Sequence, residues 1–149
     1  MNGTLVTYAS LDKKIRFFDL KTSSERVSAI QGHSGTVKCL YVCESKGILV
    51  TGSYDTSVRC WSIESGKCLA IFQGHQQTVS CLGMFDEYGR IISGSLDKTC
   101  KVWHLNKKTC WRTFKHSYPV VAVAINEEIC ITYINIIYLF MKILLLFNN

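Results

Sequence analysis

The chain consists mainly of short apolar runs separated by Gly, Asp, Asn and Ser. Such punctuation is typical of strands joined by tight turns. Some runs alternate between apolar and polar residues, whereas Gly47–Val50 is almost entirely apolar, as in sheets covered on both faces. No segment shows sustained helical periodicity, so the pattern predicts an all-β fold. In residues 78–114 it predicts four strands, Thr78–Met84, Arg90–Ser93, Lys98–Leu105 and Thr109–Phe114.

This pattern repeats along the chain. Gly32-His33 recurs as Gly74-His75, and an aspartate follows each of these histidines at the same separation. Each aspartate also precedes an aromatic residue at a constant separation. The Asp–aromatic pairs are Asp12 with Phe18, Asp55 with Trp61, and Asp97 with Trp103. Recurrence at a fixed period of about 40–45 residues indicates a repeat architecture.

The two complete units resemble WD40 repeats. The matching text is GHSGTVKCL…ILVTGSYDTSVRCWSI and GHQQTVSCL…RIISGSLDKTCKVWHL, and the resemblance extends over Leu5 to Ile129. It implies four-stranded blades of a β-propeller. The tryptophans are followed by Ser62 and His104 where the family often has aspartate, and Phe18 replaces the tryptophan of the first unit.

The expected fold is therefore all-β: a partial WD40 β-propeller of about three four-stranded blades with an apolar, non-repeat C-terminal tail. Closed propellers have about 4–8 blades, so we expect a fragment or truncated isoform of a longer WD40 protein. The predicted divisions are a partial blade at 1–31, WD40 repeats at 32–73 and 74–114, an incomplete repeat at 115–133, and the tail at 134–149.

The C-terminal segment leaves three interpretations open. From Ile129 to Phe147 the only charged residue is Lys142. The segment could be unrelated to the repeat, arising from alternative splicing or from reading past an exon end, and its Ile-, Asn-, Tyr- and Leu-rich composition favours this. It could also be a divergent pair of strands, or a C-terminal membrane anchor, for which its length suffices.

Two recurring sets of polar residues could be mistaken for catalytic Ser-His-Asp triads. They occur twice and lack a GxSxG elbow, which favours a structural role and no enzymatic activity. By resemblance to WD40 blades, the tryptophan donates to the hydroxyl, which bonds the histidine, which bonds the aspartate. The predicted tetrads are His33, Thr51, Asp55 and Trp61, and His75, Ser93, Asp97 and Trp103; Asp12, Phe18 and His116 belong to partial tetrads.

Cysteine spacing argues against metal and disulfide sites. The chain has eight cysteines, but no CxxC or HxxxH cluster. Cys39 and Cys81 occupy equivalent positions in successive repeats, as do Cys68 and Cys110. We therefore expect reduced, buried cysteines that act as small hydrophobic residues, no metal or cofactor, and a cytoplasmic or nuclear location. The start of the chain contains no secretory signal pattern.

The net charge of +6 is concentrated in Lys98–Lys115. A basic stripe can bind nucleic acid, but no aromatic-interleaved motif accompanies it, so solvated strand edges are the favoured interpretation. A weak basic nucleic-acid-binding module stays an alternative, as does a membrane-anchored or non-functional truncation product acting through residues 134–149.

By resemblance, one face of the propeller binds other proteins or peptides. The third residue after each histidine and the residue before each tight-turn aspartate line that face. Of these, Tyr54 and Leu96 are the most informative, because apolar side chains at exposed turns make interface anchors. The resemblance predicts a non-catalytic protein–protein interaction scaffold, and is strongest to F-box/WD-repeat proteins, which are substrate-recognition subunits of cullin-type ubiquitin ligases. The candidate partner-binding residues are Leu11, Thr36, Tyr54, Thr78, Leu96 and Pro119.

Overall fold

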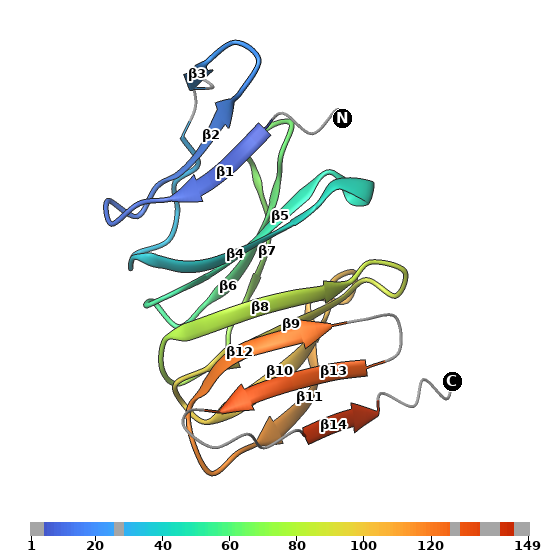
Figure 1. Cartoon of the computed structure of the whole chain (residues 1–149). Helices are drawn as coiled ribbons and strands as arrows, with labels where there is room; N and C mark the ends of the chain where they lie inside the picture. Colours follow the sequence, from blue (N-terminus) through green and yellow to red (C-terminus); the bar gives the residue numbers. More distant parts are fainter. Residues whose placement is uncertain (1–4, 26–28, 126–128, 135–140, 145–149) are drawn as a thin grey trace.

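The computed structural model describes residues 5–25, 29–125, 129–134 and 141–144, which form four antiparallel sheets in chain order. Figure 1 shows the sheets following one another from the blue N-terminal sheet to the red C-terminal strand. β1 lies beside β4, β4 beside β8, and β8 beside β12, so the first strands of successive sheets are neighbours. The all-β prediction is confirmed for the described residues, which include one 3-10 turn, η1 (Glu44–Lys46).

The first sheet has three strands and the next two have four each. The first contains β1 (Leu5–Ala9), β2 (Ile15–Asp19) and β3 (Ser24–Glu25). The second contains β4 (Val37–Cys43), β5 (Ile48–Ser53), β6 (Val58–Ser62) and β7 (Cys68–Phe72). The third contains β8 (Val79–Phe85), β9 (Arg90–Ser95), β10 (Thr99–His104) and β11 (Thr109–Lys115). The strands predicted for residues 78–114 agree with β8–β11 to within two residues at each end.

The fourth sheet contains β12 (Val120–Ile125), β13 (Ile129–Ile134) and β14 (Met141–Leu144), in that order. β14 lies within the predicted tail and pairs with β13, with Ile129 opposite Leu144. This pairing agrees with the interpretation of the C-terminal segment as a divergent pair of strands. Residues 135–140 and 145–149 of the tail lie outside the described residues. Among the described residues, no helix has the length and apolar character needed to cross a bilayer.

Successive sheets pack face to face through apolar clusters. Leu49 of β5 belongs to the cluster between the first and second sheets, with Ile15 and Phe17. Its neighbour Val50 belongs to the cluster between the second and third sheets, with Val79. Because adjacent side chains of a strand point to opposite faces, a strand covered on both sides must be apolar at consecutive positions. This packing explains the unbroken apolar run that ends at Val50.

The prediction that the cysteines are buried is only partly correct. Cys43, Cys60, Cys81 and Cys100 are buried, and Cys39 is half-buried. Cys68 and Cys110 are exposed, because each begins or nearly begins the outermost strand of its sheet, β7 or β11, where no further strand covers it. Each of these cysteines is a free thiol.

Close approach between sheets depends on Gly52, near the end of β5. A Cβ atom at this position would lie 2.5 Å from Cγ1 of Val79 and 2.7 Å from Sγ of Cys39. Gly94, the equivalent residue of the next sheet, has the same role: a Cβ atom there would lie 2.5 Å from both Cys81 Sγ and Val120 Cγ1. The first strand of the following sheet, β8 or β12, can therefore approach only because these positions lack a side chain.

We predict that Gly52→Ala lowers the free energy of unfolding by about 1–3 kcal/mol, because the new methyl group overpacks the contact with Val79. Urea unfolding followed by tryptophan fluorescence measures the change. In a Val79→Ala background the same substitution should cost less, because the obstructing methyl groups are gone. An equal cost in both backgrounds would show that this contact is not the cause.

Candidate functional site

A chain of hydrogen bonds joins four buried side chains in the second sheet. The indole Nε1–H of Trp61 donates to Oγ1 of Thr51 over 2.8 Å. Oγ1 of Thr51 lies 2.7 Å from Nε2 of His33, and Nδ1 of His33 lies 2.8 Å from Oδ2 of Asp55. The third sheet repeats this arrangement at equal or nearly equal distances, from Trp103 through Ser93 and His75 to Asp97. The structure thus brings together each of the two predicted complete sets.

The geometry assigns one direction to every hydrogen bond. A carboxylate only accepts, so Nδ1–H of His33 donates to Asp55. Nε2 of the neutral ring is then an acceptor, to which the hydroxyl group of Thr51 donates a hydrogen bond. The oxygen of that hydroxyl group in turn accepts the hydrogen bond from the indole N–H of Trp61. Each of these groups has a partner, which is the condition for burying polar side chains without a large cost.

The aspartates also fix the local backbone. Oδ1 of Asp55 accepts the backbone N–H and the hydroxyl of Ser57, and Oδ2 accepts the backbone N–H of Ser34. The residue between Asp55 and Ser57, Thr56, adopts a left-handed φ of 69° in the tight turn. One carboxylate therefore ties the β5–β6 turn to the segment that enters β4.

Four hydroxyl residues that were not predicted as part of the site extend it. Thr99 contacts Asp97 as Ser57 contacts Asp55. The hydroxyl of Ser53 donates to the carbonyl of Thr36 over 3.0 Å, and that of Ser95 donates to the carbonyl of Gln77 over 3.1 Å. Their sequence signal is the same recurrence from one repeat to the next: Ser53 with Ser95, and Ser57 with Thr99.

Burial controls the electrostatics of this site. Burial lowers the pKa of His33 and of His75, and the hydrogen bond to an aspartate only partly offsets this. Burial by itself would raise the pKa of Asp55, but hydrogen bonds from Ser57 and His33 outweigh it and the pKa falls below the usual range. The stable state is thus a neutral imidazole beside a carboxylate.

The same burial limits what the site can do chemically. The side chains of Thr51 and Ser93 are fully buried and committed to two hydrogen bonds each, so a substrate cannot reach them as nucleophiles. No group of three His, Cys, Asp or Glu side chains suited to a metal ion occurs in the part of the chain that the structure describes. The arrangement stabilises the sheets.

The candidate partner-binding residues lie at one end of the sheets. Leu11, Tyr54 and Leu96 occupy the turns β1–β2, β5–β6 and β9–β10, with exposed fractions of 84%, 54% and 36%. The backbone N–H of Tyr54 donates to the carbonyl of Thr36, and that of Leu96 donates to the carbonyl of Thr78, both over 3.0 Å. We call the end of the sheets that carries Leu11, Thr36, Tyr54, Thr78, Leu96 and Pro119 the rim.

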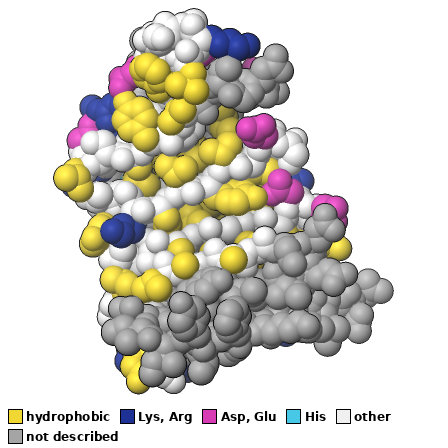
Figure 2. Space-filling view, in the orientation of Figure 1, with side chains coloured by type: hydrophobic (Ala, Val, Ile, Leu, Met, Phe, Trp, Pro, Cys, Tyr) yellow, Lys and Arg dark blue, Asp and Glu magenta, His cyan; other side chains and the backbone are white. Residues whose placement is uncertain are grey.

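Figure 2 shows hydrophobic side chains along its left edge, over the turns that precede β4 and β8. Acidic side chains lie on the opposite edge, beside the far ends of the same strands. Pro119 immediately precedes β12 and is half-buried, as are Thr36 and Thr78. The most exposed apolar residues of the rim are therefore the three turn residues.

Comparison with known proteins identifies the family. The family model of the WD domain, G-beta repeat, matches residues 24–62 and 66–104. The chain is a WD40-repeat protein. Each matched segment begins near the last strand of one sheet and ends with the third strand of the next, so a WD40 repeat links two successive blades.

Curated relatives share the repeats over short stretches. The F-box/WD repeat-containing protein 10 of Mus musculus is 38% identical over 71 residues, covering 48% of this chain and 7% of that protein. Mitochondrial division protein 1 of Mycosarcoma maydis is 48% identical over 61 residues, covering 41% of this chain and 7% of that protein. The probable E3 ubiquitin ligase complex SCF subunit scon-2 of Neurospora crassa is 38% identical over 52 residues, covering 35% of this chain and 8% of that protein. The matched part of the chain thus spans less than a tenth of each of these proteins.

The incomplete WD40 units differ from the complete ones. Asp12 forms an ion pair with Arg16 and accepts the backbone N–H of Lys14. The hydrogen bond from Arg16 lowers the pKa of Asp12 to about 2. Phe18 of β2 lies opposite Val6 and has no N–H to donate from its ring. Within the described part of the chain, Nε2 of His116 is buried without a hydrogen-bond partner, whereas the same atom of His33 and His75 bonds a hydroxyl group.

We predict that Asp97→Ala lowers the free energy of unfolding by about 1–3 kcal/mol, because it leaves buried donors of His75 and the β9–β10 turn without an acceptor. Chemical denaturation measures the loss. Glu87→Ala, at an exposed position of the β8–β9 turn, is the control and should change stability by less than about 0.5 kcal/mol. Equal effects of the two substitutions would contradict a special role for the tetrad.

We also predict that stability falls on acidification from about pH 7.5 to about pH 5, because histidines in the unfolded chain take up protons near their ordinary pKa of about 6.5. His33 and His75 have lowered pKa values in the folded protein and resist protonation. Urea midpoints across this range measure the slope. The double variant His33→Gln/His75→Gln should show a shallower slope, and an unchanged slope would exclude these two residues as its source.

Proposed function

We propose that the chain is a protein-interaction scaffold whose rim binds a partner protein or peptide. The observation that carries this proposal is the recurrence of an exposed apolar residue at the same turn of three successive blades, Leu11, Tyr54 and Leu96. These three turn residues keep 36–84% of their surface exposed, and clustered apolar anchors are typical of binding faces. The two complete tetrads hold the turns that carry Tyr54 and Leu96 in place.

We further propose that the bound proteins are substrates of a ubiquitin ligase. Two kinds of relative support this: F-box/WD repeat proteins, and a probable subunit of an SCF E3 ubiquitin ligase complex. Both carry WD40 sequence that aligns with this chain. A cytoplasmic or nuclear location is part of the proposal, and the free thiols of the described cysteines suit a reducing compartment.

The rim is tested by substituting Tyr54→Ser together with Leu96→Ser in the full tagged chain and comparing the proteins recovered with it by quantitative mass spectrometry. The matched control is Tyr88→Ser with Leu20→Ser, which removes a tyrosine and a leucine of 46% and 55% exposure from the opposite end of the blades. Partners that depend on the rim should fall about ten-fold or more with the first variant and stay constant with the second.

Recovery of the same partners by the rim variant and the wild type would refute the binding role of the rim. The ubiquitin-ligase part has a separate readout: rim-dependent partners should carry ubiquitin conjugates and become longer-lived when ubiquitylation is blocked. Partners that depend on the rim but keep the same lifetime would refute this part alone.

A further inference from the structure

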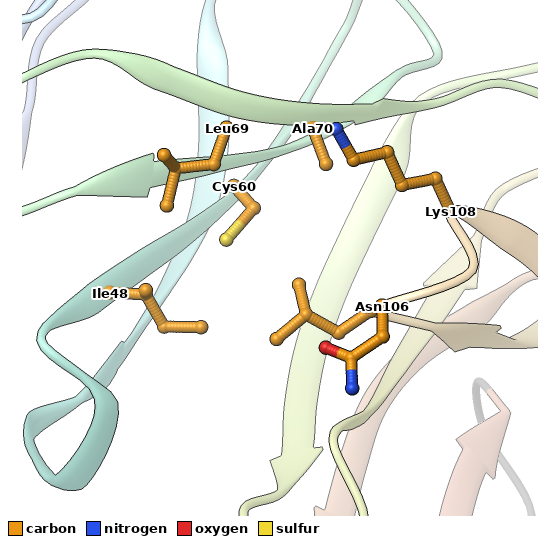
Figure 3. A pocket seen from close by; sticks show the side chains of 7 residues that line it. Ile48, Cys60, Leu69, Ala70, Asn106 and Lys108 are labelled. Atoms are coloured by element: carbon orange, nitrogen blue, oxygen red, sulfur yellow. The ribbon is translucent and has the colours of Figure 1, made fainter.

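A second apolar site lies between the second and third blades, at the end opposite to the rim. It is a pocket of about 360 Å³. The second blade contributes the side chains of Ile48, Cys60, Leu69 and Ala70 to its wall. Figure 3 shows these side chains facing the β10–β11 turn, from which Asn106 and Lys108 extend. Leu105 completes the wall on that side.

A β-bulge in β7 opens this pocket. Cys60 pairs with Ala70 and Trp61 pairs with Cys68, which leaves Leu69 as an extra residue without a partner across the ladder. Such a bulge re-aims the side chain of the extra residue. Leu69 consequently lines the pocket beside Ala70, and 44% of its surface is exposed.

The third blade carries different side chains at the positions equivalent to Leu69 and Ile48. β11 has the same bulge at the equivalent position, and its extra residue is Trp111. The position equivalent to Ile48 is Arg90, whose guanidinium group stacks 4.7 Å from the ring centroid of Trp111. Two large, stacked side chains therefore occupy these positions in the third blade, whereas the smaller Leu69 and Ile48 occupy them in the second.

Lys108 places a positive charge at the mouth. Its φ of 55° lies in the left-handed region that favours glycine, and the equivalent residue of the preceding unit is Gly66, with φ 67°. The backbone turn is closed by a hydrogen bond of 2.8 Å from the N–H of Lys108 to the carbonyl of His104. In Figure 3 the side chain of Lys108 extends from this turn toward Ala70.

The charge on the pocket wall is one-sided. None of its lining residues is acidic, and the only ionic group on its wall is the ammonium of Lys108. Burial raises the pKa of the Cys60 thiol to about 11, so this lining residue is neutral. The positive charge of Lys108 is close enough to oppose the rise in pKa. An occupant that matches this surface has an apolar side chain for the pocket and a carboxylate beside it.

We propose that this pocket binds a short acidic peptide segment of a partner protein, which inserts one aliphatic side chain between Leu69 and Leu105 and places an adjacent carboxylate against Lys108. The pocket is separate from the rim. Its residues lie at the start of β5 and just after the end of β10, whereas Tyr54 and Leu96 lie in the turns just after the ends of β5 and β9.

The test uses three acetylated and amidated pentapeptides, Gly-Glu-Leu-Glu-Gly, Gly-Lys-Leu-Lys-Gly and Gly-Glu-Ser-Glu-Gly, titrated into the ¹⁵N-labelled full chain. We expect the first peptide to shift the amide signals of Leu69, Leu105 and Asn106 in a saturable way, and the other two to bind more weakly. No saturable binding of the first peptide, or equal binding of the acidic and basic peptides, would overturn the proposal.

Two variants use residues that the chain itself carries at equivalent positions. Leu69→Trp copies Trp111 and should abolish binding by filling the pocket. Lys108→Gly copies Gly66 and should weaken binding of the acidic peptide by about two- to five-fold. Lys107→Ala is the charge-matched control, because Lys107 does not line the pocket, and should bind as the wild type does.

Thermal unfolding and amide spectra confirm that each variant is folded before binding is compared. Undiminished binding by folded Leu69→Trp, or equal losses with Lys107→Ala and Lys108→Gly, would overturn the proposal. The rim variant Tyr54→Ser/Leu96→Ser should bind the acidic peptide normally. Failure of the rim as a binding face and failure of this pocket are therefore separate outcomes.

Discussion

Each complete blade buries four polar side chains that must satisfy one another's hydrogen bonds, and this requirement orders its strands and turns. In each complete blade the indole, the hydroxyl, the imidazole and the carboxylate lie within 2.7–2.8 Å of their partners. A missing member would leave a buried donor or acceptor unpaired, which costs about 1–3 kcal/mol. The network therefore fixes which turn lies above which strand, in addition to adding stability.

The consequence of this constraint is visible at the rim. Asp55 and Asp97 each accept backbone N–H groups from the segment before the first strand of the sheet and from the turn after its second strand, so the turns that follow β5 and β9 have the same conformation. The side chains just before these aspartates are then free to differ, as Tyr54 and Leu96 do. A rigid polar network inside the blade thus carries a variable surface, which is the arrangement expected of a binding scaffold.

Differences between the blades arise where the repeats are not identical. Glycine at position 66 and lysine at position 108 occupy the same turn, and leucine at position 69 and tryptophan at position 111 occupy the same bulge. The backbone is shared, whereas the space between adjacent blades depends on these side chains. The pocket between the second and third blades is consequently lined by Leu69 where the third blade carries Trp111.

The repeat pattern of the sequence predicts the individual blades, whereas the contacts between blades follow from packing in the folded chain. The regular repeat spacing, the Gly and Asp turns and the apolar runs predicted β8–β11 to within two residues, and the recurrence of His, Ser or Thr, Asp and Trp predicted both complete tetrads as sets. These features are periodic and local, and a repeat shows them twice. Cys68 and Cys110 were predicted as buried because their spacing reveals equivalence but not which strand is outermost.

The repeat pattern does not predict the contacts made across turns and between blades. Ser57 and Thr99 join the tetrads because the β-turn brings them back to the aspartates, and Gly52 matters because Val79 of the next sheet lies 2.5 Å from where its Cβ would be. The pocket beside Leu69 depends on a bulge and on a turn from another blade. Contacts between blades join residues far apart in the chain, and their geometry is set by packing, which no single repeat records.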